Sequence, residues 1–252
     1  MLNVEEISKD FGGLRALHQV DLVVRAGAIT ALIGPNGAGK TTLINLISGV
    51  YGPSEGTISF EEKRIDRFPP HRVAEIGIAR TFQLTKLFEG MSVLENVMVG
   101  AHPWARNSRF LPTVLHLLKV RRERNDIWEY AMKMLKLIRV EHLANVPAGN
   151  LPHGQQRLVE LARALTTKPK LILVDEPAAG LNLHEEGMLQ EALKSIVDTG
   201  TTILLVEHHM RLVMRISHWV YVLDVGKMIA HGTPEEIGKN PLVVKAYLGK
   251  EY

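Results

Sequence analysis

Nine consecutive residues, from Gly34 to Thr42, have the types and the spacing that hold a phosphate group. The segment reads Gly34-Pro35-Asn36-Gly37-Ala38-Gly39-Lys40-Thr41-Thr42 and fits the pattern G-x-x-x-x-G-K-[ST] without a mismatch. Its glycines allow successive backbone N–H groups to point at phosphates, at the positive end of the next helix. In loops of this pattern the lysine reaches the β- and γ-phosphates, and the following hydroxyl, here that of Thr41, binds Mg²⁺. A glycine turn beside a surface lysine is the alternative, and the flanking elements decide between the two.

Two adjacent carboxylates, Asp175 and Glu176, follow the apolar run at residues 171–174. A carboxylate at the end of a buried strand supplies the hard oxygen ligand that Mg²⁺ prefers. A second carboxylate is not needed for the metal, so we expect Glu176 to act as the general base that polarises an attacking water. An acidic pair at a strand end is common by itself, and the phosphate loop upstream makes this interpretation specific.

A third candidate is the segment Leu151-Pro152-His153-Gly154-Gln155-Gln156-Arg157. Apolar residues then recur at helical spacing on one face, namely Leu158, Leu161, Ala162 and Leu165. The step Gly154-Gln155 therefore opens a helix, where free N–H groups and the helix dipole favour an anion. Taken alone, a helix start after a proline turn explains the segment equally well.

The elements that position these residues are predicted by short apolar runs. Residues 30–33 precede the phosphate loop as a buried strand, and residues 43–47 follow it with helical spacing. Further runs at 171–174, 202–206 and 219–223 are almost continuously apolar, as in a parallel sheet covered on both faces. Ligands bind at the carboxyl ends of such strands, which is where Asp175 and His208 fall.

The remaining segments predict two additions to this core. Alternation at residues 20–24 and a short run at 57–60 indicate strands of a small antiparallel sheet. Residues 85–160 are helical in character and contain a capping box, Ser92 to Glu95. We therefore expect an α/β fold of one domain, 1–252, with its core in 1–84 and 161–252 and an inserted helical subdomain at 85–160.

Composition excludes several classes of function. The 252 residues are 46% hydrophobic and 23% charged, which is ordinary for a globular protein. The net charge of +3 is a small imbalance and weak evidence for binding to nucleic acid. The chain contains no cysteine, so it has no disulfide framework and no thiol chemistry. It shows no signal-peptide pattern. Because no run of eighteen apolar residues occurs, a membrane role would require a partner.

In their order along the chain, these motifs resemble those of ATP-binding cassette ATPases. The resemblance covers essentially the whole chain and implies a P-loop NTPase fold, ATP and Mg²⁺. It also implies that two such domains pack head to tail, with each ATP between the phosphate loop of one and Gly154 and Gln155 of the other. The second domain is a second copy of this chain or a paralogue.

The resemblance also implies roles for residues that the motifs alone leave unassigned. Phe11 is similar to the aromatic residue that stacks on adenine, although a phenylalanine in the core is the alternative. Gln83, after Thr81-Phe82, resembles the glutamine that contacts Mg²⁺ and senses the dimer interface. His208 resembles the histidine that contacts the γ-phosphate, and residues 179–182 resemble the loop that crosses the dimer.

Four segments are similar to the importer ATPases for branched-chain amino acids: residues 11–14, 80–83, 177–182 and 240–249. This implies an ATPase on the cytoplasmic face of the membrane, bound to permease subunits and working indirectly with a substrate-binding protein, without nucleic acid. Other cargo, such as urea, other amides or lipopolysaccharide, stays open because substrate contacts lie on other subunits. A soluble ATPase acting on ribosomes would show a coiled coil or two cassettes, and a regulator without turnover would not need Glu176 and His208.

The chain departs from the family pattern at the third candidate segment. Pro152 stands where the family has a serine and His153 where it has a glycine, and Leu183 stands where relatives often have proline. Proline cannot donate the hydrogen bond that a serine hydroxyl offers to the γ-phosphate of the partner's ATP. These departures put the full cooperativity of the shared site in question.

Overall fold

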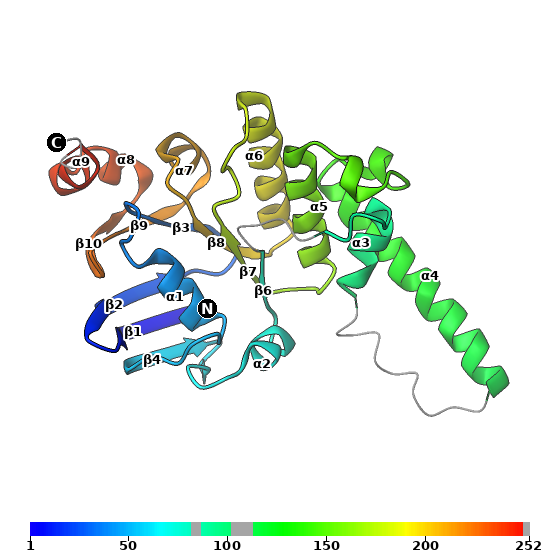
Figure 1. Ribbon diagram of the computed structural model, residues 1–252, viewed down its shortest axis with the longest axis horizontal. Helices are drawn as coiled ribbons and strands as arrows, with labels where there is room; N and C mark the ends of the chain where they lie inside the picture. Colours follow the sequence, from blue (N-terminus) through cyan, green and yellow to red (C-terminus); the bar gives the residue numbers. More distant parts are fainter. Residues whose placement is uncertain (82–86, 102–112, 249–252) are drawn as a thin grey trace. The chain divides into compact units, whose positions relative to one another are not determined.

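The computed structural model describes residues 1–81, 87–101 and 113–248, with the side chains of 113–122 excepted (Figure 1). Contacts within the chain define two compact units. The first comprises Met1–Arg80, Lys170–Ala179 and Val197–Tyr252, and the second comprises Thr81–Pro169 and Gly180–Ile196. The predicted helical subdomain, 85–160, lies within the second unit, which extends beyond it on both sides and also includes most of the helix at 183–198.

A mostly parallel sheet of six strands forms the core of the first unit (Figure 1). Its strands, in spatial order, are β10 (Lys227–Gly232), β9 (Trp219–Asp224), β3 (Ile29–Ile33), β8 (Thr202–Val206), β7 (Leu171–Asp175) and β6 (Ile78–Arg80). All neighbours are parallel except β10, which runs antiparallel to β9. Every residue of β3, β7 and β8 is buried, which confirms the reading of the apolar runs.

As predicted, the first unit also contains an antiparallel sheet. Its order is β2 (Leu14–Val24), β1 (Leu2–Phe11), β4 (Glu55–Phe60) and β5 (Lys63–Arg64). Side chains from this sheet, from the parallel sheet and from α1 (Lys40–Ile47) bury one another in a common hydrophobic core. Because the sheet and α1 share this core, the antiparallel strands are fixed relative to the loop that precedes α1.

Helices account for most of the remaining structure. The first unit also holds α2 (Pro70–Glu75), α7 (Met210–Ile216), α8 (Pro234–Gly238) and α9 (Pro241–Leu248). The second unit holds α3 (Val93–Val99), α4 (Thr113–Leu137), α5 (His153–Leu165) and α6 (Leu183–Asp198), with short 3-10 turns η2 (Glu141–Leu143) and η3 (Ala148–Asn150). The predicted capping box is present, since Ser92 Oγ accepts from the Glu95 N–H and Glu95 Oε2 accepts from the Ser92 N–H.

Candidate functional site

The phosphate loop runs from the end of β3 to the start of α1, and two of its glycines cannot be replaced without a clash. Gly34 has a φ of 153°, and a Cβ there would collide with the carbonyl oxygen of Leu223. Gly39 has a φ of 105°, and its Cβ would lie 2.7 Å from Leu17 Cδ2. Packing against β9 and β2 therefore requires glycine at both ends of the loop, independently of any ligand.

Lys40, the first residue of α1, folds its side chain back over this loop. Its Nζ donates to the carbonyl oxygens of Gly34 at 2.7 Å and Pro35 at 3.0 Å. Burial lowers the pKa of Lys40, and the carboxylates of Glu176, Asp175 and Glu207 act in the opposite direction. The buried ammonium is thus surrounded by oxygen acceptors that a phosphate can replace. The hydroxyl-bearing Thr41 is exposed beside it, and Thr42 is partly buried.

Asp175 ends β7, and an arginine holds its carboxylate. Arg80 Nη2 donates to Asp175 Oδ2 at 3.1 Å, while Arg80 Nη1 donates to Asn45 Oδ1 at 2.6 Å and Ser48 Oγ at 3.1 Å. Burial raises the pKa of Asp175, and the guanidinium of Arg80 opposes that rise. One side chain at the end of β6 therefore connects the acidic strand end to α1. The sequence around Arg80 does not predict its contact with Asp175.

Glu176 has a backbone conformation that is rare for a residue with a side chain. Its φ is 44°, and its N–H donates to the carbonyl oxygen of Val206 on the neighbouring strand at 2.9 Å. A left-handed residue other than glycine costs about 1–3 kcal/mol. This conformation accompanies a mostly buried carboxylate, whose Oε1 lies 3.9 Å from Nδ1 of the half-exposed His208. The structure thus places Glu176, the expected general base, next to His208, the residue expected to contact the γ-phosphate.

Glu207, for which no sequence motif predicts a role, supports both of these residues. It is fully buried, its Oε1 accepts from the Ala178 N–H at 2.8 Å, and its Oε2 accepts from the N–H groups of His208 at 2.9 Å and His209 at 3.2 Å. The carboxylate therefore joins the segment after β7 to the segment after β8. An acidic residue directly before His208, at the end of an apolar strand, was the signal in the sequence.

We predict that Glu207→Gln lowers the free energy of unfolding by about 1–3 kcal/mol, because the amide nitrogen faces a backbone N–H and leaves a buried donor unsatisfied. Urea titration followed by circular dichroism measures the change. Glu235→Gln is the matched control, since Glu235 is 79% exposed and pairs only across one helical turn with Lys239. Equal stability of the two variants would show that the buried carboxylate is not a structural link.

The other predicted residues fall in three places. Phe11 ends β1 with 42% of its surface exposed, so the alternative of a core phenylalanine is wrong. Gln83 lies outside the described residues. Gly154 and Gln155 belong to the second unit, in the first turn of α5 after Pro152, and a Cβ on Gly154 would lie 2.6 Å from Glu185 Oε1. Pro152 and His153 are both exposed.

Comparison with known proteins agrees with this fold. Residues 17–179 match the ABC transporter family, and residues 227–252 match the family described as branched-chain amino acid ATP-binding cassette transporter. The chain belongs to the ABC transporter family and is one of its ATP-hydrolysing subunits. Among the described residues, no helix combines the length and the apolar character needed to cross a membrane.

More particular relatives extend over the full chain. The chain is 42% identical to the high-affinity branched-chain amino acid transport ATP-binding protein LivG of Salmonella typhimurium, over 99% of this chain and 98% of that protein. It is 41% identical to the corresponding protein BraF of Pseudomonas aeruginosa, over the same shares of the two chains. A solved ATP-binding cassette of an ABC transporter in its ADP conformation is 34% identical with a TM-score of 0.86, over 99% of each chain. A dimeric bacterial cassette is 25% identical with a TM-score of 0.76, over 93% of this chain and 99% of that one.

Proposed function

We propose that this chain hydrolyses ATP to drive an importer of branched-chain amino acids. One observation carries the ATPase part. Lys40 at the start of α1, Asp175 at the end of β7 with Glu176 directly after it, and His208 after β8 lie at the carboxyl edge of one sheet. The cargo is supported by the full-length similarity to LivG and BraF and by the match of residues 227–252.

The first unit would bind the nucleotide through its phosphate loop and its exposed aromatic residue. The backbone N–H groups of the loop Gly34–Thr42, except at Pro35, which has none, and the ammonium of Lys40 would bind the phosphates, and Phe11 would stack on the adenine. The Thr41 hydroxyl and the Asp175 carboxylate are hard oxygen donors of the kind that suits Mg²⁺, with Gln83 as a further donor. Mg²⁺ would neutralise the charge that develops on the transferred phosphate.

Two residues would act on the reaction itself. Glu176 would accept a proton from the attacking water, and His208 would donate a hydrogen bond to the γ-phosphate. A second subunit, either another copy or a paralogue, would contribute the start of its α5, with Gly154 and Gln155, to the same ATP. Permease subunits would dock this pair on the cytoplasmic face of the membrane, and a substrate-binding protein would act indirectly.

The test is ATP-driven uptake by vesicles that contain the chain, its paralogue where one is needed, and the permease subunits, with the substrate-binding protein added. We expect uptake of labelled leucine, isoleucine and valine, and no uptake of labelled urea. Uptake of urea alone would leave the assignment as an ATPase in place and would make urea, instead of branched-chain amino acids, the cargo. Hydrolysis that drives no uptake would reject the importer.

We also predict effects of the departures at the start of α5. Pro152 is the N-cap residue and makes no side-chain hydrogen bond to the helix. A serine there would supply the partner's γ-phosphate with a charge-assisted hydrogen bond of about 1.5–3 kcal/mol. We therefore expect Pro152→Ser to raise ATP turnover or ATP-driven dimerisation. We expect His153→Gly in the otherwise unmodified chain to lower them, because it removes the imidazole that would compensate for the missing serine hydroxyl. Steady-state phosphate release in the assembled transporter measures both, and unchanged rates would show that the Gly154 N–H and the helix dipole suffice.

A further inference from the structure

Phe11 lies near the tip of the hairpin formed by β1 and β2, and this tip extends beyond the last backbone pair between β1 and β4. The last backbone pair between β1 and β4 is Ser8 with Glu55, and the register between β1 and β2 shifts on both sides of Lys9. The hairpin then continues through Phe11 to a turn at Gly12, whose φ is 59°. Past Ser8, this tip borders β4 through side chains instead of through paired backbone groups.

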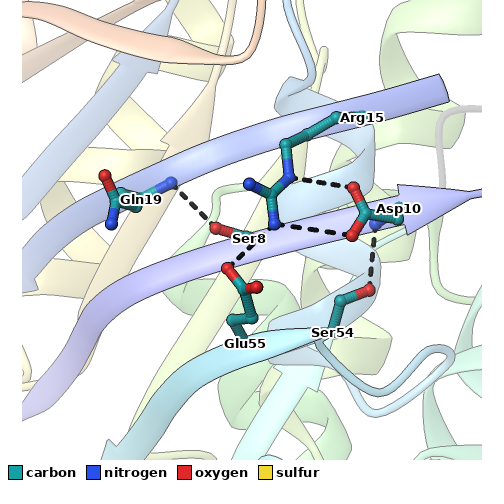
Figure 2. A network of polar contacts seen from close by, with 6 residues as sticks. All are labelled: Ser8, Asp10, Arg15, Gln19, Ser54 and Glu55. Atoms are coloured by element: carbon teal, nitrogen blue, oxygen red, sulfur yellow. Dashed lines mark hydrogen bonds and ion pairs between the residues drawn. The ribbon is translucent and has the colours of Figure 1, made fainter.

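A polar network centred on Arg15 closes this gap (Figure 2). Arg15 Nε lies 2.9 Å from Asp10 Oδ1 across the hairpin, and Arg15 Nη2 lies 2.8 Å from Glu55 Oε2 on β4. The Asp10 N–H donates to Ser54 Oγ at 3.0 Å, and the Ser54 N–H returns to the Ser8 carbonyl oxygen at 2.9 Å. Both strands of the tip are therefore attached to the segment just before and at the start of β4.

The same segment provides the surroundings of the Phe11 ring. Tyr51 meets Phe11 edge to face with ring centroids 5.5 Å apart, and the two residues are 42% (Phe11) and 41% (Tyr51) exposed. Lys9 Nζ lies 5.1 Å from the Phe11 ring centre and donates to the Gly52 carbonyl oxygen at 2.8 Å. Edge-to-face contact favours one tilt of the Phe11 ring, and the exposed part of the residue is available to a further aromatic partner.

We propose that Arg15 is a positioning residue for nucleotide binding: it holds the hairpin tip against residues 51–55 so that the Phe11 face, set by Tyr51, receives the adenine base. The inference rests on the proposed function, because it takes Phe11 as the adenine contact. An arginine suits this position, since its planar fork reaches carboxylates on two strands at once, which a lysine ammonium does less well.

The experiment compares two ligands that share the phosphate loop and differ in the base. Calorimetric titration of the purified full-length chain with ADP and with inorganic pyrophosphate, each with Mg²⁺, separates the two contributions. We expect Phe11→Ala to weaken ADP binding about tenfold and Arg15→Gln to weaken it about threefold. Neither should change pyrophosphate binding, and Arg15→Lys should recover part of the ADP affinity. Arg72→Gln, which removes an exposed arginine paired with Glu75 at 3.1 Å in the same unit, is the matched control.

A double variant decides whether Arg15 acts through Phe11. In the Phe11→Ala chain, Arg15→Gln should have no further effect on ADP binding, because residues acting through one contact are not additive. Equal losses for ADP and pyrophosphate, full additivity, or unchanged ADP binding would each overturn the proposal. A failure of the proposed function gives another result: ADP and pyrophosphate would bind to the Lys40→Ala variant as tightly as to the unmodified chain.

Discussion

Lys40→Ala is expected to abolish nucleotide binding or nearly so. The ammonium now bonded to the Gly34 and Pro35 carbonyl oxygens would be lost, and with it the contacts to the β- and γ-phosphates. Two charge-assisted hydrogen bonds are worth about 3–6 kcal/mol together, or about two to four decades in affinity. The carboxylates of Asp175, Glu176 and Glu207, which Lys40 partly balances, would also repel the phosphates.

Calorimetric titration with ATP and ADP measures this loss. Lys239→Ala is the control, because Lys239 is 76% exposed and pairs with Glu235 on a surface helix. Unchanged ATP affinity in Lys40→Ala, with the fold intact by circular dichroism, would refute the assignment of the phosphate loop.

Glu176→Gln should leave ATP binding intact and stop turnover. The amide keeps the size of the side chain and the left-handed backbone, but it cannot accept a proton from water. Loss of a well-placed general base costs about two to four decades in rate. Because bound ATP is then not consumed, we also expect the variant to accumulate as an ATP-dependent dimer.

Phosphate release and size-exclusion chromatography with and without ATP follow the two effects separately. Glu62→Gln is the control, since Glu62 is an exposed carboxylate in the same unit. Hydrolysis near the rate of the unmodified chain would assign the base to another residue, whatever the elution profile shows.

The sequence predicted those parts of the fold and site that depend on local patterns. The buried strands β3, β7 and β8 are mostly apolar runs in the sequence, and the phosphate loop is a fixed spacing of glycines before Lys40. Each pattern spans fewer than ten residues, so neighbouring positions suffice to recognise it. Because ligands bind at the carboxyl ends of parallel strands, the sequence also predicts that Asp175 and His208 lie at one edge of the sheet.

The supporting residues could not be predicted in this way, because their partners are distant in sequence. Arg80 reaches Asp175 across 95 positions, and Glu207 reaches the Ala178 N–H across 29. The residues next to Arg80 do not distinguish it from a surface charge. The position of Glu207, at the end of an apolar strand and before His208, indicates a buried carboxylate but does not identify its partner. Phe11 illustrates the same limit, since an aromatic residue in a strand is ordinarily buried and only the tertiary position of the hairpin tip leaves it exposed.

The positive φ of Glu176 has an evolutionary consequence. Glycine or asparagine would adopt that backbone more readily, so either would relieve the backbone strain at residue 176 while removing the carboxylate. Because domains are stable by only about 5–15 kcal/mol, selection for thermal tolerance alone would favour such replacements. Retention of glutamate at residue 176 therefore requires continuous purifying selection for activity, and lineages that no longer need this ATPase should lose Glu176 before they lose its surrounding core.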